Sequence, residues 1–488
     1  MDKLLQEIEE SLNKAQYDRK RNIVQLTLKA CIYLLPDRKK EICDLFDNMK
    51  YNIAKEAAMT ILVSEICAAA EDKIIVPEYS QKHAAEQKVY VYVGTHWKLI
   101  STQVFYDFVT EACRKIGLSE VLIFSKYMCA IFEEVAFKMS RNIESYQPCD
   151  AVWINLQNCT VEINNNGTIS THEHRPEDFF RYCLPYAYDP QADCPLWKNF
   201  LNEVLPETQA QTLLGEYIGY CFTQNLKLEK MAVFYGSGAN GKSVCLDVIR
   251  NLFGQENISE ATLSSITNNP ETRSMLKDKL VNISSESGKN LNAAVLKMLI
   301  SGEPVEMRIL YVGTKKLKNP PKLITAYNIL PPIENSYGFR RRWLLFPFNK
   351  TIPVEKQDHA LAQKLCTELS GILNWVLKHL ACLIERVNQN NGNSFTDSPE
   401  CNAALNEYFK SSNSVALFLD EACEKRDDTV NSMKDLYNSY LSYCHNSGYL
   451  KPFILKNFKK ELIDWGAMLT VKHKVNYFNV TVDSSVYM

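Results

Sequence analysis

The sequence lacks the cysteine pairs and the charge imbalance that mark several classes of protein. Its 16 cysteines include no Cys-x-x-Cys pair, and the closest two, Cys149 and Cys159, are ten positions apart. This spacing excludes zinc ribbons and thioredoxin-like redox motifs, and scattered thiols fit a reducing compartment. The formal net charge is −2 over 488 residues. No overall field therefore attracts a polyanion, and any contact with nucleic acid must come from local basic patches.

Apolar runs of membrane-spanning length are also missing. The run "AAMTILVSEICAAA" at 57–70 carries Glu65 and is too short to cross a bilayer. The chain does not open on a basic segment followed by an apolar leader, and it contains no low-complexity tract. We therefore expect a folded cytoplasmic protein without membrane contact. With 46% hydrophobic residues, it can bury the cores of three or four domains.

The first two hundred residues read as a helical head followed by an α+β region. Residues 1–80 space their apolar positions three and four apart, which predicts helices. The stretch "KVYVYVGTHWKLI" alternates and breaks at Gly94, which predicts a hairpin. Helical patterns follow over 101–142, and "VWINLQNCTVEINNNGTIS" predicts a strand pair that turns at "NNNG". We assign this second region to residues 81–205.

Strands and helices then alternate. The strands "MAVFYG", "DKLVNISSES" and "KLITAYN" are separated by the helical stretches "SVCLDVIRNLFG" and "AAVLKMLISG". Such alternation predicts an α/β fold, in which a mostly parallel sheet has helices on both faces. A long helical stretch over 356–390 precedes "NQNNGNSFTDSPE", the clearest linker. Three further helical patterns and two strands in "AMLTVKHKVNYFNVTV" follow in the order of a winged helix.

The segment "YGSGANGKSV" satisfies the pattern G-x-x-x-x-G-K-[ST] between a predicted strand and a predicted helix. Glycines let backbone N–H groups turn toward phosphate oxygens, and a helix N-terminus adds partial positive charge. In such loops the lysine reaches the β- and γ-phosphates and the hydroxyl ligates Mg²⁺. We therefore expect ATP and Mg²⁺ to bind here. The expected binding residues are Gly236, Ser237, Gly238, Ala239, Asn240, Gly241, Lys242, Ser243 and Val244.

Polar residues at other strand ends are candidates for catalysis. Glu286 ends "KLVNISSE" and is the expected catalytic acid and, with Ser243, metal ligand; the alternative is a solvated glutamate at a strand end. Asn328 follows "KLITAY" and is either a γ-phosphate sensor or a turn residue. Three arginines precede the apolar strand in "GFRRRWLLFPF". One arginine at a γ-phosphate raises the rate by several powers of ten, and it could act in trans within a ring of subunits.

These motifs, in this order, resemble superfamily-3 helicases of the phage, plasmid and large-DNA-virus primase-helicase group. The resemblance rests on "GSGANGKS", "LVNISSES", "LKMLISGEPVEMRILY", "KLITAYNILP" and "RRRWLLFPF", and extends over about residues 85–488. It implies an AAA+ P-loop NTPase core at 206–392. It also implies a homo-hexameric ring that hydrolyses ATP between subunits and pulls single-stranded DNA through its centre.

The resemblance assigns further roles. Either Arg341 or Arg342 is the finger that reaches the next subunit, and Arg340 is the extra arginine. "KMLISGEPVEMRILYVGTKKLKNPP" corresponds to a DNA-gripping hairpin, with Lys315 and Lys316 expected at its tip or, alternatively, in a solvated turn. Residues 301–350 contain nine basic and three acidic residues, an excess that can neutralise DNA phosphates. The basic residues are Arg308, Lys315, Lys316, Lys318, Lys322, Arg340, Arg341, Arg342 and Lys350. Larger members carry a primase, whose chemistry needs paired aspartates; no D-x-D occurs here, so we expect no primase activity.

Residues 393–488 hold the linker and the expected winged helix. "PFILKNFKKELIDWG" would be its recognition helix and "VKHKV" its wing. The expected DNA-binding residues are Arg308, Lys315, Lys316, Lys456, Lys459, Lys460, Lys472 and Lys474. The tail binds either duplex DNA, as at an origin, or another subunit or protein partner.

The leading hypothesis from the sequence is an ATP-driven DNA helicase that acts in replication of a phage, plasmid or integrated mobile element, in the cytoplasm of a bacterial host. The alternatives are an origin-binding protein whose ATPase controls assembly, and a nucleotide switch without motor activity.

Overall fold

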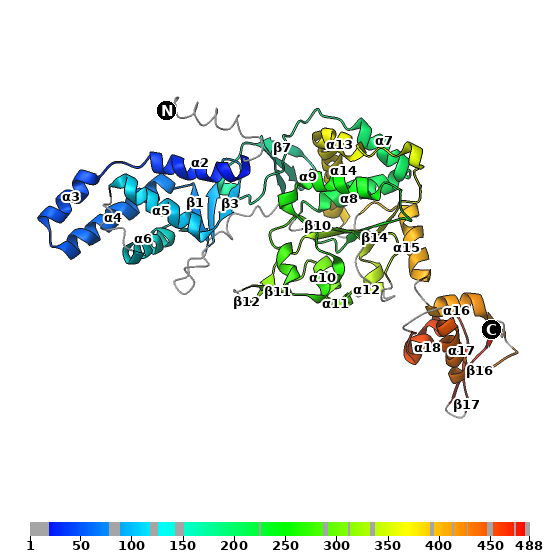
Figure 1. Ribbon diagram of the computed structural model, residues 1–488. Helices are drawn as coiled ribbons and strands as arrows, with labels where there is room; N and C mark the ends of the chain where they lie inside the picture. Colours follow the sequence, from blue (N-terminus) through cyan, green and yellow to red (C-terminus); the bar gives the residue numbers. More distant parts are fainter. Residues whose placement is uncertain are drawn as a thin grey trace. The chain divides into compact units, whose positions relative to one another are not determined.

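The computed structural model describes residues 19–77, 88–117, 125–141, 151–223, 226–285, 291–310, 313–331, 337–390, 395–411, 414–426, 428–446, 452–472 and 475–483. The chain forms two compact units, and each is built from segments that are distant in sequence (Figure 1). The first unit comprises Met1–Asp193, Leu252–Asn257 and Leu369–Gln389. The second comprises Cys194–Asn251, Ile258–Glu368 and Asn390–Met488.

The first unit begins with helices packed on a small sheet. The helices are α2 (Arg19–Tyr33), α3 (Lys39–Asn48), α4 (Tyr51–Ala70), α5 (Thr102–Ile116) and α6 (Ser125–Lys138). The sheet has the order β3-β2-β1-β4, with β1 (Ile74–Pro77), β2 (Val89–Tyr92), β3 (Trp97–Ile100) and β4 (Ser140–Arg141). The hairpin predicted around Gly94 is confirmed, because β2 and β3 pair antiparallel and Gly94 adopts φ 88° at their turn.

A second, antiparallel sheet in this unit contains β5 (Ala151–Asn155), β6 (Thr160–Asn164) and β7 (Ile169–His172). The sequence predicts two strands in this segment, whereas the structure has three. The turn at "NNNG" is present, but a second turn divides the preceding residues into two strands. The long helix α14 (Leu369–Asn390) packs here, where Nδ2 of Asn388 donates to the Asn165 carbonyl over 2.5 Å.

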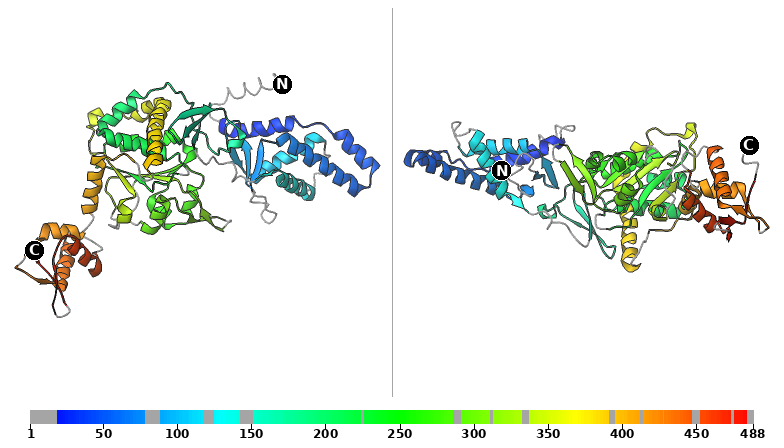
Figure 2. Two further views of the ribbon diagram at one scale, coloured as in Figure 1. Left: turned by 180° about the vertical axis from the view of Figure 1, so that it is seen from behind. Right: turned by 90° about the horizontal axis from the view of Figure 1, so that it is seen from below.

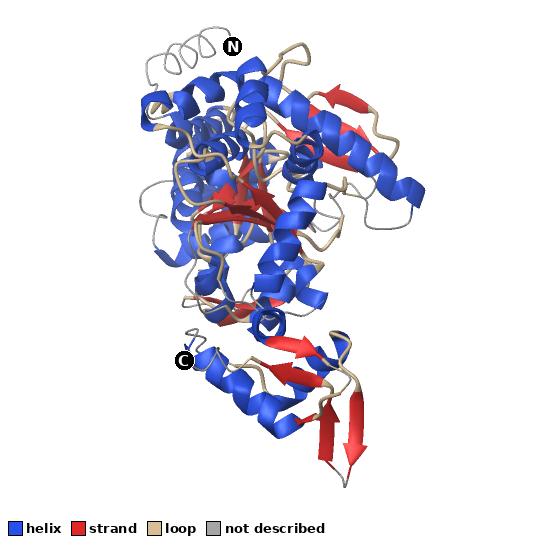
Figure 3. Cartoon of the chain, turned by 90° about the vertical axis from the view of Figure 1, so that its right-hand side faces the viewer, coloured by secondary structure: helices blue, strands red, loops and turns tan. Residues whose placement is uncertain are grey.

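The second unit is built on a five-stranded sheet with the order β14-β8-β13-β10-β9 (Figures 1 and 3). The strands are β8 (Met231–Tyr235), β9 (Ile258–Ser259), β10 (Val281–Ser285), β13 (Lys322–Tyr327) and β14 (Trp343–Pro347). Every pair in it is parallel, which confirms the predicted mixed α/β character with a parallel sheet. The strands are largely buried, as in sheets covered on both faces.

Helices and one hairpin complete this core. The helices are α7 (Pro195–Val204), α8 (Thr208–Tyr220), α9 (Lys242–Phe253), α10 (Leu263–Asn268), α11 (Ala293–Ile300), α12 (Tyr337–Arg340), α13 (Leu361–Leu365) and α15 (Pro399–Ser411). The hairpin consists of β11 (Val305–Ile309) and β12 (Gly313–Leu317). Helix α15 packs on β14, where the rings of Tyr408 and Trp343 stack 5.7 Å apart.

The polar stretch before α15 is bonded to α8. The amide and hydroxyl of Thr396 donate to the carboxylate of Glu216 over 2.7 and 2.6 Å, and Glu216 is fully buried. The hydroxyl of Ser398 donates to Glu207, and the ring of Phe395 lies 5.6 Å from that of Tyr220. The described part of the predicted linker is therefore held in place by hydrogen bonds to two carboxylates, of which that of Glu216 is fully buried.

The C-terminal elements gather around a core of their own (Figure 2). The helices are α16 (Ser414–Ala422), α17 (Met433–Asn446) and α18 (Leu455–Asp464). The strands are β15 (Cys423–Lys425), β16 (Asn431–Ser432), β17 (Leu469–Lys472), β18 (Val475–Phe478) and β19 (Val480–Val482). The rings of Tyr440 and Phe458 stack 4.8 Å apart inside this core. The predicted strand pair corresponds to β17 and β18.

Candidate functional site

The glycine-rich loop 236–241 joins β8 to α9 and needs a backbone that most residues avoid. Gly238, Ala239 and Gly241 all have positive φ angles, of 112°, 48° and 84°. A Cβ on Gly241 would also lie 2.7 Å from Cγ1 of Val204 on α7. Glycine is therefore required at 241 both by conformation and by space.

The loop is fastened to the chain that leaves β14. Nδ2 of Asn240 donates to the Phe348 carbonyl over 2.8 Å, and the Ile352 amide donates to the Ala239 carbonyl over 2.7 Å. A Cβ on Gly236 would lie 2.3 Å from the same Phe348 oxygen. Asn240 is 3% exposed, so its hydrogen bond to the Phe348 carbonyl is buried.

Lys242 begins α9 and is 6% exposed. Its ammonium donates to the Gly236 carbonyl over 2.7 Å and to Oδ1 of Asn240 over 2.9 Å. Ser243, in the same first turn, is exposed, and Val244 is half-buried. A cation and a free hydroxyl at a helix N-terminus form a donor set that suits phosphate oxygens and a phosphate-bound Mg²⁺. In the described part of the chain, no cluster of three or more His, Cys, Asp or Glu side chains could hold a metal by itself.

Other predicted residues follow the neighbouring strands at the same edge of the sheet. The Gly236 amide donates to the Tyr327 carbonyl over 3.3 Å, so the end of β13 lies beside the loop. Asn328 comes directly after β13 and is exposed. Ser285 pairs with Ala326, so β10 ends at this edge too. Glu286 is the next residue, but it lies outside the described residues, and its roles as acid and metal ligand stay predictions.

Arg341 and Arg342 lie at the opposite edge of the sheet. Trp343 of β14 pairs with Met231 at the start of β8, and the Met231 amide donates to the Arg342 carbonyl over 2.9 Å. The loop, in contrast, follows the other end of β8. Five strand residues separate the two edges, which is about 16 Å at 3.3 Å per residue. The two arginines are therefore remote from the loop of their own chain.

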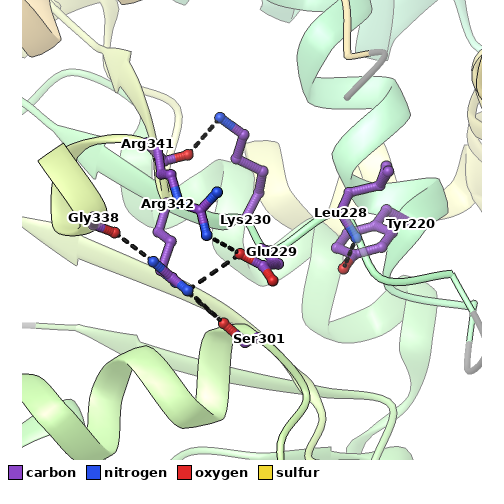
Figure 4. Close-up of polar contacts among 8 residues, drawn as sticks. All are labelled: Tyr220, Leu228, Glu229, Lys230, Ser301, Gly338, Arg341 and Arg342. Carbon is purple, nitrogen blue, oxygen red and sulfur yellow. Dashed lines mark hydrogen bonds and ion pairs between the residues drawn. The ribbon is translucent and has the colours of Figure 1, made fainter. Parts of the chain in front are cut away.

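The guanidinium groups of these arginines meet at Glu229 (Figure 4). Nη2 of Arg341 lies 2.7 Å from Oε2 of Glu229, and Nη2 of Arg342 lies 3.2 Å from the same oxygen. Arg342 also donates to Oγ of Ser301 and to the Gly338 carbonyl. Glu229 was not singled out from the sequence, because no local pattern marks a glutamate that pairs with residues more than a hundred positions away.

The basic residues of the predicted DNA hairpin are exposed along β11 and β12. The register pairs Arg308 with Thr314, Met307 with Lys315 and Glu306 with Lys316. The last pair in this register is Ile309 with Gly313, and Gly313 adopts φ 99° at the start of β12. The placement of Lys315 and Lys316 at the tip is therefore wrong: both lie within β12, on opposite faces of the hairpin. Arg308 is 3.6 Å from Glu271.

A buried arginine, Arg273, anchors this hairpin to the core. Nη1 of Arg273 donates to the Glu306 carbonyl over 2.7 Å, while Nε and Nη2 donate to the carbonyls of Ile266 and Thr267. Burial lowers the pKa of Arg273. Sequence reasoning missed this residue, since its partners are backbone atoms that carry no sequence signal.

The predicted C-terminal DNA residues are only partly exposed. On α18, Lys456 and Lys460 are exposed one turn apart, whereas Lys459 is half-buried. Lys472 ends β17, and Lys474 lies outside the described residues. The exposed apolar side chains on and next to the hairpin of β17 and β18 are Met468, Leu469, Val471 and Val475. The C-terminal elements therefore expose basic side chains on α18 and apolar side chains on the hairpin.

The sequence predicts scattered free thiols and no membrane-spanning segment. The cysteines among the described residues are free thiols. Within the described ranges, no helix is both long enough and apolar enough to span a bilayer.

Three family models match successive parts of the chain. "D5 N terminal like" matches residues 72–206, "Family of unknown function (DUF5906)" matches 234–342, and "Poxvirus D5 protein-like" matches 410–487. The middle match begins two residues before the glycine-rich loop and ends at Arg342. The matched segments thus bracket and include the candidate site.

Similar proteins come from large DNA viruses. "Putative helicase L207/L206" of Acanthamoeba polyphaga mimivirus is 24% identical over 186 residues, which is 36% of this chain and 19% of that protein. "Putative primase C962R" of African swine fever virus is 23% identical over 167 residues, which is 32% of this chain and 17% of that protein. The chain therefore matches less than a fifth of the length of these relatives.

Solved structures of the NrS-1 C-terminal region also match. Two apo structures are each 12% identical and cover 87% of this chain and 98% of theirs, with TM-scores of 0.45 and 0.42. These scores are too low to support a detailed comparison. The family models and the viral relatives agree with the resemblance seen in the sequence: segments on both sides of the candidate site are similar to the D5 families that these models describe.

Proposed function

We propose that the chain is the ATP-hydrolysing motor of a DNA helicase that acts in replication. The observation that carries this proposal is the arrangement at the carboxyl edge of the sheet. There the loop 236–241, the buried ammonium of Lys242 and the exposed Ser243 face the same edge as Asn328. In open α/β sheets, ligands bind outside the carboxyl ends of the strands. The names of the viral relatives support a role in replication.

The residues of this edge fit ATP with Mg²⁺. Backbone amides of the loop and the start of α9 would bind phosphate oxygens, and Lys242 would exchange its present acceptors for the β- and γ-phosphates. Ser243 would hold Mg²⁺, with Glu286 as the second group and the catalytic acid. Bound ATP supplies the phosphoryl group whose transfer to water releases free energy. Asn328 would orient the γ-phosphate or the water.

We propose a homo-hexameric ring, and the separation of the arginines from the loop supports a site shared between subunits. A triphosphate held by Lys242 cannot meet Arg341 or Arg342 of the same chain, because a full strand lies between them. A neighbouring chain that presents its amino edge to this carboxyl edge would supply the missing guanidinium. Such head-to-tail contacts form a ring when the rotation between neighbouring subunits closes.

Single-stranded DNA is the proposed polymer in the centre of the ring. Arg308, Lys315 and Lys316 are exposed on the hairpin of β11 and β12, and a basic hairpin binds phosphates without reading sequence. We further propose that residues 206–392 form the AAA+ core and that residues 393–488 end in a winged helix. The absence of D-x-D within these 488 residues supports a motor without primase chemistry.

The test is ATP turnover of the full chain with and without single-stranded DNA. We expect hydrolysis that DNA stimulates, together with a sixfold ring in images taken with ATP and DNA. A monomer that hydrolyses no nucleotide under any condition would refute the proposal.

The alternative is an origin-binding protein whose ATPase controls assembly, or a nucleotide switch that acts on a protein. Exposed Lys456 and Lys460 favour duplex DNA at the C-terminal elements, and the apolar side chains exposed on the hairpin of β17 and β18 favour a protein partner. Strand displacement on a forked substrate separates the motor from both alternatives. ATP-dependent displacement supports the motor, and duplex binding without displacement supports the origin-binding protein.

A further inference from the structure

The three consecutive arginines before β14 differ in how firmly the chain holds them, and Figure 4 shows two of them, Arg341 and Arg342. Arg342 is the most firmly held. Its Nε and Nη2 donate to Oγ of Ser301 over 3.1 and 2.9 Å, and its Nη1 donates to the Gly338 carbonyl over 2.6 Å. Its side chain is 12% exposed. These contacts join β14 to the end of α11 and to α12, which makes Arg342 a structural residue.

Arg340 is engaged elsewhere. Its Nη2 donates to Oδ1 of Asn406 on α15, and its guanidinium lies 5.9 Å from the ring centre of Phe409. Arg340 therefore points to α15.

Arg341 is the arginine that can leave its present position. Its side chain is 49% exposed, and among the described residues its guanidinium pairs with Glu229 alone. Its carbonyl accepts a hydrogen bond from Nζ of Lys230 over 2.7 Å. Burial, together with the charge of Arg341, lowers the pKa of Lys230. The backbone of Arg341 is thus fixed, while its guanidinium depends on one partially exposed carboxylate.

Glu229 stands on a loop whose backbone is also fixed. The Leu228 amide donates to Oη of Tyr220 over 3.0 Å, and Nζ of Lys322 donates to the Leu226 carbonyl over 3.1 Å. Glu229 itself adopts φ 53°, a left-handed conformation that is uncommon for glutamate. Its carboxylate is held at the position where two guanidinium groups meet.

We propose that Glu229 is a positioning residue. It holds the guanidinium of Arg341 within its own chain until the triphosphate bound by a neighbouring chain replaces Glu229 as the partner of Arg341. The inference rests on the proposed function, since it needs a nucleotide-loaded neighbour. Ion pairs at exposed sites contribute little stability, so a triphosphate competes readily with one carboxylate. Arg341 is then the finger, and Arg342 keeps its intrachain contacts throughout. Glu229 therefore weakens assembly onto a triphosphate-loaded neighbour, because Arg341 must leave this carboxylate before it reaches the γ-phosphate.

The test is assembly of the full chain over a range of protein concentrations, with a non-hydrolysable ATP analogue or with ADP. Glu229→Gln keeps the size of the side chain and removes its charge. We expect it to reach half-maximal assembly at about twofold to fivefold lower concentration than wild type with the analogue. With ADP, which lacks the γ-phosphate, we expect no difference. In an Arg341→Ala background, Glu229→Gln should have no effect, because no guanidinium remains to be released.

Glu424→Gln is the matched control. Glu424 also pairs with an arginine at an exposed site, Arg426, over 2.8 Å. It should assemble like wild type. A Glu229→Gln variant that assembles no more readily than wild type, or whose shift persists in the Arg341→Ala background, would refute the role of Glu229. A wild-type chain that neither assembles with the analogue nor hydrolyses ATP would instead refute the proposed function, and this inference with it.

Discussion

Lys242 is a buried cation at the start of α9, and its burial determines what its removal does. Its ammonium is balanced by a carbonyl and an amide oxygen. If these are exchanged for phosphate oxygens in the bound state, Lys242→Ala removes a charge that acts on the transferred group. We expect ATP turnover to fall at least about a hundredfold. Lys364→Ala, at an exposed lysine paired with Asp358, should leave turnover unchanged. Equal turnover in the wild type and Lys242→Ala would exclude the loop as the site of hydrolysis.

Asn240 is expected to shape the loop without touching the reaction. Asn240→Ala removes the donor to the buried Phe348 carbonyl and one acceptor of the Lys242 ammonium, and the loss of buried hydrogen bonds is costly. We expect affinity for ATP to fall about tenfold, with a smaller effect on the maximal rate. Titration with a fluorescent ATP analogue and a thermal melt measure the two effects. A fall in the maximal rate at unchanged affinity would argue for a direct role in hydrolysis.

The residues of the loop could be predicted from sequence, but their partners could not. Gly236, Gly241, Lys242 and Ser243 form one short pattern, and its chemistry is local. The Phe348 carbonyl that binds Asn240 is 108 positions away, and the Glu229 carboxylate that binds Arg341 is 112 positions away. No spacing rule links such residues. The choice between Arg341 and Arg342 therefore needed the contacts of each side chain.

Among the elements, the hairpin of β11 and β12 carries the clearest prediction. Lys315→Ala with Lys316→Ala removes two exposed charges from β12. If both contact phosphates of single-stranded DNA, the slope of log K against log salt should become shallower by about 1.4. The measurement is the affinity for a single-stranded oligonucleotide of arbitrary sequence at several salt concentrations.

The matched control for the hairpin is Lys356→Ala with Lys364→Ala, at two exposed lysines remote in sequence from the hairpin. This pair removes the same charge and should not change the slope. An equal loss in both double variants would show that the effect comes from net charge, and the hairpin would not be the contact.

Element prediction succeeded where periodicity was long and failed where elements were short. The strands β8, β13 and β14 were expected from runs rich in apolar residues, and β10 was expected from Leu280, Val281 and Ile283. The strands β9 and β16 have two residues each, and β15 and β19 have three, which is too few to show alternation. Lys315 and Lys316 were misplaced because the turn depends on Gly313, whose role is visible only in the register.

For the whole molecule, the prediction concerns sharing of sites between subunits. Lys242→Ala and Arg341→Ala should each be inactive alone, since one lacks the lysine and the other the guanidinium. In an equal mixture, about a quarter of the contacts in a head-to-tail ring join an intact loop to an intact Arg341. We expect ATP turnover to return on mixing, as measured by phosphate release. If rings shown to contain both variants stay inactive, Arg341 does not act on the site of a neighbouring subunit.

The composition of the two units could not have been predicted from sequence. Helix α14 packs on strands more than two hundred positions earlier, and residues Leu252–Asn257 join the first unit although both flanking segments belong to the second. Patterns of apolar residues show which face of an element is buried but not which element covers it. The parallel character of the large sheet was predictable, because alternation of strands and helices leaves few other arrangements.

The hydrogen bonds between α8 and the segment before α15 determine where chimeras of this chain can be joined. A graft made within the polar stretch at 391–394 keeps the donors of Glu216 only if the incoming chain supplies its own Thr396 and Ser398 equivalents. Without them, a fully buried carboxylate loses its donors, and Trp343 also loses the ring of Tyr408. The interchangeable piece therefore starts after Ser411, and a homologue's C-terminal elements are best exchanged from that point.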